Sequence, residues 1–168
     1  MSRTFARTQQ QGPEADSPSS SPFNPHQKTN MPKHEKALSA ALTPLSELIY
    51  AVLRIVSGAM FAFHGVQKVL GLLTDSPADF GSQMWIGGVI ELVGGLMIAL
   101  GFWTRTAAFL CSGTMAVAYF QFHWKFQFDE GFLPIVNQGE MAVLYCFVFL
   151  FIASRGAGVW AIDRQKSA

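Results

Sequence analysis

The chain has few charged side chains and no concentrated basic region among its 168 residues. Charged residues make up 14% of the sequence, whereas a soluble domain averages about 25%. This shortfall argues against an ordinary soluble domain, and the 50% hydrophobic content favours a membrane protein. Because the lysines and arginines are scattered and the net charge is +1, no nucleic-acid partner is expected.

Cysteine is also scarce, and its placement predicts no cofactor. Cys111 and Cys146 both lie in apolar runs, without CxxC spacing and without a nearby histidine pair. We interpret both as buried structural thiols. His64, His123 and Glu91 could form a facial set of metal ligands, but none shows local ligand spacing. We therefore expect no metal and no covalently bound cofactor.

The first part of the chain lacks the periodic apolar residues that a packed helix needs. Residues 1–43 are dominated by serine, proline, glutamine and asparagine, so burial could not repay the entropy of ordering them. Arg3 and Arg7 lie near the start, but the continuous apolar core of a secretory signal is missing and Glu14 and Asp16 intervene. We predict that residues 1–43 form a disordered cytoplasmic tail.

Long apolar segments, in contrast, are plentiful after residue 43. A helix of roughly 20 residues crosses a hydrocarbon core of about 30 Å. The predicted spans are residues 44–69, 84–100, 105–122 and a segment from 138 or 139 to 154. Thr43 before Pro44 is a good helix start, residues 101–104 suit only a tight hairpin, and residues 129–139 are predicted to be a loop. The predicted fold is therefore all-α, an antiparallel four-helix membrane bundle at residues 44–164, followed by a short tail at 165–168.

The positive charges near the ends of these spans predict an orientation. Four spans place both termini on one side, where the lysines and arginines gather. That side has Lys28, Lys33, Lys36, Arg105, Arg155, Arg164 and Lys166, and the other has Lys68 and Lys125. Both termini are therefore predicted to be cytoplasmic in a multi-pass protein of a bacterial cytoplasmic (inner) membrane.

Ionisable residues inside the predicted spans must be hidden from lipid. At the helical period, Arg54, Gly58, Phe61, Gly65 and Lys68 lie on one side of the first span. The predicted polar intramembrane cluster consists of Arg54, His64, Lys68, Glu91, Glu140 and His123. The glycines predicted to allow close helix packing are Gly58, Gly65, Gly87, Gly88, Gly94 and Gly95. With Arg54 as the exception, the polar cluster is predicted to lie in the outer half of the membrane.

Two interpretations of this cluster remain open. In the first, Arg54 or Lys68 pairs with Glu91 or Glu140 and only fixes the register of the helices. In the second, the cluster lines a shallow outward-facing pocket for a quinone headgroup or another small redox molecule, because quinone reduction needs hydrogen-bond donors and protons. A transporter is disfavoured, because the sequence shows no inverted repeat.

Three sequence segments together resemble the DoxX family of small bacterial membrane proteins. They are LRIVSGAMFAFHGVQKV at 53–69, GGVIELVGGLMIALGFWTR at 87–105, and Gly139-Glu140 with a glycine-rich exit to Asp163. The resemblance covers about residues 45–164. The family pattern maps onto Arg54, Gly58, His64, Gly65, Lys68, Glu91, Gly94, Gly95, Gly101, Arg105, Glu140 and Asp163.

The resemblance implies a four-helix protein of the cytoplasmic membrane. Some relatives are linked to quinone-coupled thiosulfate oxidation or to membrane oxidoreductase complexes that handle thiol stress. It therefore implies an accessory membrane subunit of a quinone- or thiol-linked oxidoreductase system. Because no soluble redox domain is expected in this chain, electron transfer would need a soluble or membrane redox partner protein. The alternative is a non-enzymatic membrane scaffold whose buried charges are purely structural.

Overall fold

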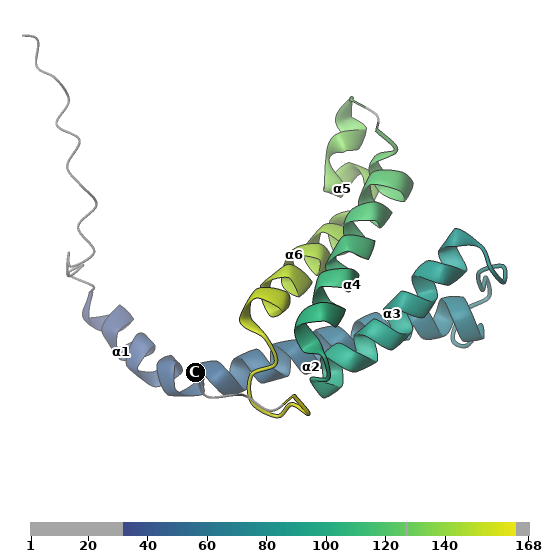
Figure 1. The fold of residues 1–168 in the computed structure, drawn as a ribbon. Helices are drawn as coiled ribbons and strands as arrows, with labels where there is room; N and C mark the ends of the chain where they lie inside the picture. The colour runs from purple at the N-terminus through teal and green to yellow at the C-terminus, as the bar shows by residue number, and fades with distance from the viewer. Residues whose placement is uncertain (1–31, 127, 164–168) are drawn as a thin grey trace, which may run out of the picture.

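A computed structural model of the chain describes residues 32–126 and 128–163. Those residues form helices and turns and no strand, so the predicted all-α class is confirmed for them (Figure 1). The α-helices are α1 (Lys33–Leu42), α2 (Ser46–Gly65), α3 (Gln83–Leu100), α4 (Thr104–Ala118), α5 (Pro134–Asn137) and α6 (Glu140–Arg155). Two 3-10 turns, η1 (Thr43–Leu45) and η4 (Glu130–Phe132), and two π-helical turns, η2 (Val66–Leu70) and η3 (Tyr119–Trp124), adjoin them.

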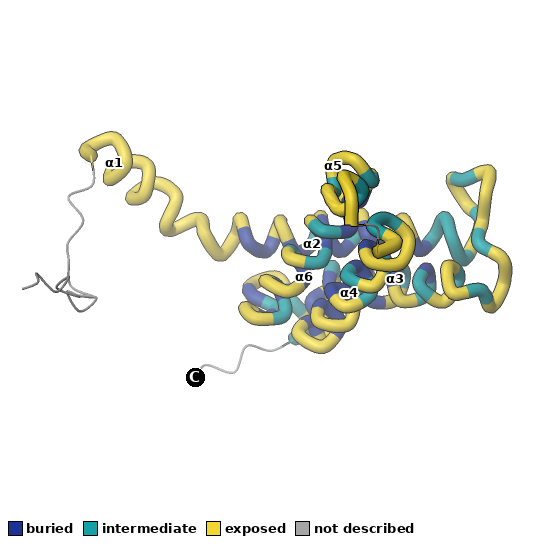
Figure 2. Tube along the Cα trace, turned by 90° about the horizontal axis from the view of Figure 1, so that it is seen from above, coloured by how far each residue is buried: buried dark blue, intermediate teal, exposed yellow. Residues whose placement is uncertain are grey.

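The predicted disordered tail at residues 1–43 is corrected at its C-terminal end. Residues 33–42 form α1, which runs through η1 into α2, whereas residues 1–31 lie outside the described part. The α1 sequence is rich in lysine, alanine and leucine, all of which favour helix. The Thr43 hydroxyl donates to the Ser39 carbonyl over 2.7 Å, a bond made inside helices, so Thr43 does not cap a new helix as predicted. Figure 2 shows α1 exposed along its whole length.

Local signals explain where the central helices begin and end. The Ser82 hydroxyl caps α3 by accepting from the Trp85 amide over 3.1 Å. Gly101 ends α3 in the left-handed conformation, with φ +70°, that glycine adopts without strain. α4 begins at Thr104, so the predicted tight hairpin is confirmed.

The segment predicted as a loop at residues 129–139 instead contains η4 and α5. The Asp129 carboxylate accepts from the Gly131 amide over 2.8 Å and so caps η4. Pro134 then starts α5, at a helix position where its missing N–H is not needed. Pro134 thus starts a helix inside the segment that was predicted to be a loop.

The four long helices pack as two pairs. α2 packs mainly on α3, α4 packs mainly on α6, and α3 with α4 joins the pairs. Figure 1 shows that the pairs diverge from the end that holds the α3–α4 hairpin. The ends that carry η2 and α5 therefore lie apart, unlike the compact arrangement expected of an antiparallel bundle.

Glycines let α2 and α3 approach closely. A Cβ added at Gly58 would lie 2.6 Å from the Ala99 nitrogen, and one at Gly65 would lie 2.3 Å from the Leu92 nitrogen. Gly95 also meets backbone on the opposite helix. These contacts are shorter than any side chain tolerates, so the α2–α3 seam depends on glycine.

The other three predicted packing glycines meet side chains or open space. A Cβ added at Gly88 would lie 2.7 Å from the Lys68 Cβ, and one at Gly94 would lie 2.4 Å from the Cys111 sulfur. A Cβ at Gly87 would meet nothing within 4 Å, so the prediction that Gly87 packs closely is wrong. Gly87 instead faces open space.

Apolar side chains cover the outside of the helices. Exposed examples occur on every long helix, including Val56, Leu96, Leu110 and Phe147. Two helical segments, residues 33–70 and 83–100, are long and apolar enough to cross a membrane. α6 has 16 residues and so spans only about 24 Å, which is why it does not qualify by length. Four membrane spans therefore stay a prediction.

Candidate functional site

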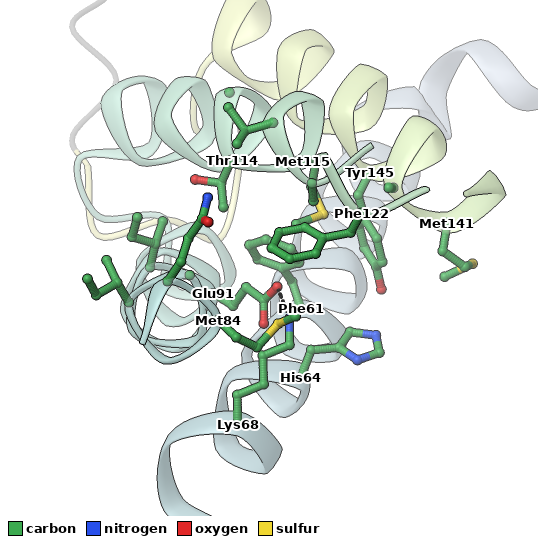
Figure 3. Close-up of a pocket in the computed structure, with 18 of the residues that line it drawn as sticks. Phe61, His64, Lys68, Met84, Glu91, Thr114, Met115, Phe122, Met141 and Tyr145 are labelled. Carbon is green, nitrogen blue, oxygen red and sulfur yellow. Dashed lines mark hydrogen bonds and ion pairs between the residues drawn. The ribbon is translucent and has the colours of Figure 1, made fainter. Parts of the chain in front are cut away.

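A cavity of about 460 Å³ lies where the two helix pairs diverge. Its walls come from α2 with η2, from α3, from α4 with η3, and from α6 (Figure 3). His64, Lys68, Glu91 and His123 of the predicted polar cluster line it, and Arg54 and Glu140 do not. The two π-helical turns supply Lys68 and His123, and such turns are frequent at functional sites because they shift side chains out of helical register.

The central polar contact of the cavity is an ion pair between Lys68 and Glu91. Lys68 Nζ lies 2.5 Å from Glu91 Oε1. The lysine comes from η2, whose Lys68 and Val69 side chains lie against Gly88 of α3. The Glu91 side chain is 4% exposed and the Lys68 side chain 30% exposed. Glu91 Oε2 is buried and has no hydrogen-bond partner in the described structure. One half of this carboxylate is thus unsatisfied beside a cavity, a costly state that a ligand would relieve.

A second unsatisfied group belongs to Tyr145 on α6. Its phenol oxygen is buried without a hydrogen-bond partner, and the residue is 6% exposed. Phe61 and Phe149 hold the ring, with centroid distances of 5.3 Å and 5.4 Å. Sequence reasoning missed this residue. The available signal was a tyrosine in the middle of an apolar segment, because a buried phenol hydroxyl needs a polar partner.

The two cavity histidines differ in how they are held. His123 Nδ1 lies 3.1 Å from the Asn137 carbonyl oxygen, which can only accept, so Nδ1 donates. In the neutral ring this leaves Nε2 as an acceptor. His64 is exposed at the edge of the cavity, where its ring stands edge-to-face with Tyr145 at 6.3 Å.

The rest of the cavity wall is mostly apolar. It includes Met84, Ile90, Met115, Phe122 and Met141, and the Cα atoms of two glycines complete it. Figure 3 shows Met84, Met115 and Phe122 close to the Lys68–Glu91 pair. An apolar cavity with a few convergent polar groups is the usual form of a small-molecule site. It suits a flat ligand with polar atoms at its edge.

No metal site accompanies these groups. In the ranges that the structure describes, no three histidine, cysteine, aspartate or glutamate side chains gather as metal ligands. Cys111 is buried and Cys146 is half-buried, and both thiols are free. The Ser112 hydroxyl donates to the Cys146 carbonyl over 2.8 Å, which ties α4 to α6.

Arg54 does not pair with Glu91 or Glu140, so that proposed pairing is corrected. Its side chain is fully buried and donates to four backbone carbonyls instead. Nη1 contacts the oxygens of Ile98 at 2.7 Å and Ala99 at 2.8 Å, and Nη2 contacts those of Val159 at 3.2 Å and Trp160 at 2.7 Å. The first two belong to the last turn of α3, where carbonyls lack helical partners and attract a cation.

Asp163 completes this attachment of the C-terminal segment. Its carboxylate accepts from the Trp103 amide and the Thr104 amide, each at 2.9 Å, and from the Thr104 hydroxyl at 2.8 Å. It therefore caps the start of α4 from a distant part of the sequence. Burial raises the pKa of Asp163, but the hydrogen bonds from Thr104 and Trp103 and the charge of Arg54 outweigh it, so the pKa lies below its usual value.

Arg105 and Glu140 lie outside the cavity. The Arg105 guanidinium donates to the carbonyls of Ala153 at 2.9 Å, Ser154 at 2.6 Å and Arg155 at 3.1 Å, which caps the end of α6. Glu140 is exposed in the first turn of α6, where a negative charge is favoured by the helix dipole. Glu140 thus serves as a surface carboxylate for comparison with Glu91.

The Asp163 cap predicts a pH-dependent stability. Because the pKa of Asp163 is lower in the folded than in the unfolded protein, the ionised carboxylate stabilises the folded protein at pH values above its unfolded-state pKa of about 3.9. This stabilisation is lost as the pH falls through the folded-state pKa. We expect Asp163→Asn to lower the melting temperature in detergent at pH 7, at a cost of about 1 kcal/mol. The difference from wild type should narrow near pH 3. A difference that stays constant between pH 7 and pH 3 would contradict this role of the carboxylate.

Comparisons with known proteins place the chain in one family. The sequence profile of a family described as DoxX matches residues 49–124. A protein of Haemophilus influenzae, described as an uncharacterized protein, is 42% identical over 119 residues, which is 68% of this chain and 88% of that protein. No solved structure matches the chain.

Proposed function

This chain belongs to the DoxX family of membrane proteins, and from that premise we propose that it is an accessory membrane subunit of a quinone- or thiol-linked oxidoreductase system. In this proposal the cavity binds a quinone headgroup, and a redox partner protein exchanges electrons with it. The observation that carries the proposal is the pair of unsatisfied buried groups at the cavity, Glu91 Oε2 and the Tyr145 hydroxyl. The cavity volume, about 460 Å³, lies within the range of small-molecule sites, roughly 300 to 1,000 Å³.

The chemistry of the cavity supports a quinone. A bound quinone needs hydrogen-bond donors for its carbonyl oxygens, and its reduction consumes protons. The Tyr145 hydroxyl has no partner, and Lys68 uses one of its three N–H groups on Glu91. The apolar wall, which includes Met84 and Phe122, suits the ring and the start of an isoprenoid tail. A ligand of this kind reaches the cavity from the lipid.

The same proposal includes four membrane spans with both termini in the cytoplasm of a bacterial cell. The spans are α2 with η2, α3, α4 with η3, and α6. The apolar side chains exposed on all of these helices support contact with lipid, because water would disfavour so large an apolar surface. The lysines and arginines near the helix ends support the orientation. The cavity then opens in the outer half of the membrane.

The orientation predicts that Asp129 is outside the cytoplasm. A single cysteine introduced at this position, in a chain whose two native cysteines are replaced by alanine, should react in whole cells with a membrane-impermeant maleimide. A cysteine introduced at Lys36 is the matched control and should react only after the cells are opened. Reaction of position 36 and protection of position 129 in whole cells would reverse the orientation.

A scaffold without redox activity is the second candidate, because other polar groups in the protein are structural. Arg54 donates to four backbone carbonyls of the described residues, and Arg105 caps α6. The Lys68–Glu91 pair could serve in the same way and hold η2 against α3. The two candidates differ in whether the pair is needed for binding or only for stability.

Substitutions of the ion pair separate the two candidates. Under the proposed function, Lys68→Met should weaken binding of decyl-ubiquinone about tenfold and Glu91→Gln should weaken binding of its reduced form, decyl-ubiquinol, about tenfold, because each removes a charged hydrogen-bonding group from the ligand site. Protein abundance should stay normal, and growth under diamide stress should fall in a strain that depends on the protein. Glu140→Gln and Lys36→Met are the matched controls and should bind as wild type does. The scaffold would be supported if the variants had lower abundance or a lower melting temperature and the wild-type protein bound no quinone.

A steric substitution tests the cavity without altering any polar group. Gly87 lines the cavity, and no atom lies within 4 Å of a Cβ added there. Gly87→Leu should therefore fold, occupy part of the cavity and reduce decyl-ubiquinone binding about tenfold or more. Unchanged binding in this variant would mean that quinone binds elsewhere.

A further inference from the structure

Two buried polar atoms at the cavity lack a partner in the described structure: Glu91 Oε2, which is an acceptor, and the Tyr145 hydroxyl, which can donate or accept. Glu91 is held as a carboxylate by the Lys68 ammonium at 2.5 Å, and a carboxylate can only accept. Its Oε2 atom is buried and has no partner in the described structure, and the Glu91 residue lines the cavity. A ligand at this position must therefore bring a proton of its own to satisfy that oxygen.

Two further groups of the cavity wall already donate a hydrogen bond to a backbone carbonyl. The Thr114 hydroxyl donates to the Leu110 carbonyl over 3.0 Å, so its oxygen offers lone pairs to the cavity. His123 donates through Nδ1 to the Asn137 carbonyl, so Nε2 of the neutral ring accepts. Thr114 lies on α4 and His123 on η3, which follows α4, whereas Glu91 lies on α3 of the other helix pair. The cavity thus offers acceptors from both helix pairs.

The cavity wall also carries hydrogen-bond donors, but none of them satisfies Glu91 Oε2. The Tyr145 hydroxyl can either donate or accept, and so fits both a carbonyl and a hydroxyl. One N–H of the Gln83 side chain is used on Gln121, across the space between α3 and η3. Lys68 donates one of its three N–H groups to Glu91 Oε1 and is partly exposed, and His64 lies at the exposed edge of the cavity.

From these groups we infer that the cavity binds the hydroquinone form of its ligand in preference to the quinone form. A hydroquinone presents two O–H groups on an aromatic ring, and Glu91 Oε2 accepts from one of them. A quinone has only carbonyl oxygens, which would leave Oε2 unsatisfied and place two acceptors against each other. The inference rests on the proposed function and adds which redox form the site retains.

The direct test compares three ligands on the wild-type protein in detergent under nitrogen. The ligands are decyl-ubiquinol, decyl-ubiquinone and the dimethyl ether of the quinol, and their dissociation constants are measured by equilibrium dialysis. We expect the quinol to bind about tenfold tighter than either of the others, because only it can donate to a buried acceptor. Equal or tighter binding of the quinone, or of the ether, would overturn the inference while the quinone site itself stands. Absence of binding by all three would overturn the proposed function.

One variant links the preference to Glu91. In Glu91→Gln the side-chain carbonyl can still accept from Lys68, but an N–H₂ group replaces the free acceptor, so the preference for the quinol should fall about tenfold. Glu140→Gln carries the same chemical change on the surface and should keep the wild-type preference. A Glu91→Gln protein that elutes as a single species and retains the full preference would contradict the role of Oε2.

Discussion

Replacing Arg54 by methionine is expected to lower the free energy of unfolding by about 3 kcal/mol or more. The guanidinium is fully buried and donates to four carbonyls, two on α3 and two in the C-terminal segment. Methionine roughly fills the space but donates nothing, so four carbonyls, one of them in a fully buried hydrogen bond, lose this partner. The expected readout is a large fall in melting temperature and in the yield of monodisperse protein in detergent.

A surface arginine provides the matched control for this substitution. Arg155 stacks over the Tyr50 ring with its guanidinium carbon 4.2 Å from the centroid, and it pairs with the exposed carboxylate of Glu47. Arg155→Met should cost less than about 1 kcal/mol, because exposed ion pairs contribute little. Arg54→Lys should rescue little, since one ammonium cannot reach two separate pairs of carbonyls. Equal effects of Arg54→Met and Arg155→Met would show that the Arg54 contacts do not hold the C-terminal segment.

The second large effect is expected at the seam between α2 and α3. Gly65→Ala places a methyl group 2.3 Å from the Leu92 nitrogen and 2.5 Å from the Gly88 oxygen, both of which are backbone atoms that cannot rotate away. The two helices must separate, which should lower the free energy of unfolding by about 2 to 3 kcal/mol. The separation should also shift η2 and weaken ligand binding, because Lys68 is three residues away.

Gly87→Ala is the control, because it makes the same chemical change on α3 in open space. Alanine favours helix over glycine by about 1 kcal/mol, so this variant should be as stable as wild type or slightly more stable. Thermal unfolding of both variants in the same detergent provides the comparison. If Gly65→Ala were as stable as Gly87→Ala, the close approach of α2 and α3 would not be needed for the fold.

The parts of the fold that the sequence predicted best are those with local signals. The predicted span at 84–100 differs by one residue from α3, because Ser82 and Gly101 mark its ends. The helical segment before Pro44 was missed, because proline near a helix start fits both a new helix and a 3-10 turn within a continuing one. Local sequence rules could not distinguish a new helix from a 3-10 turn within a continuing helix.

The candidate site was predicted only in part, for a physical reason. An ionisable residue in an apolar segment is recognisable in the sequence because it must be hidden from lipid. Lys68 and Glu91 were therefore among the predicted pairs, and the structure pairs them. The partners of Arg54 are backbone carbonyls, which every residue has, so no side chain marks them in the sequence. Tyr145 joins the cavity because α6 packs on α4, and such packing between distant segments leaves no local pattern.

The most direct measurement is the quinone content of the purified wild-type protein. The protein is isolated from membranes in mild detergent and extracted with organic solvent, and quinone and quinol are quantified against protein. We predict close to one molecule per chain in wild type and a large loss in Gly87→Leu purified in parallel. Equal, trace amounts in both proteins would contradict a quinone site in the cavity.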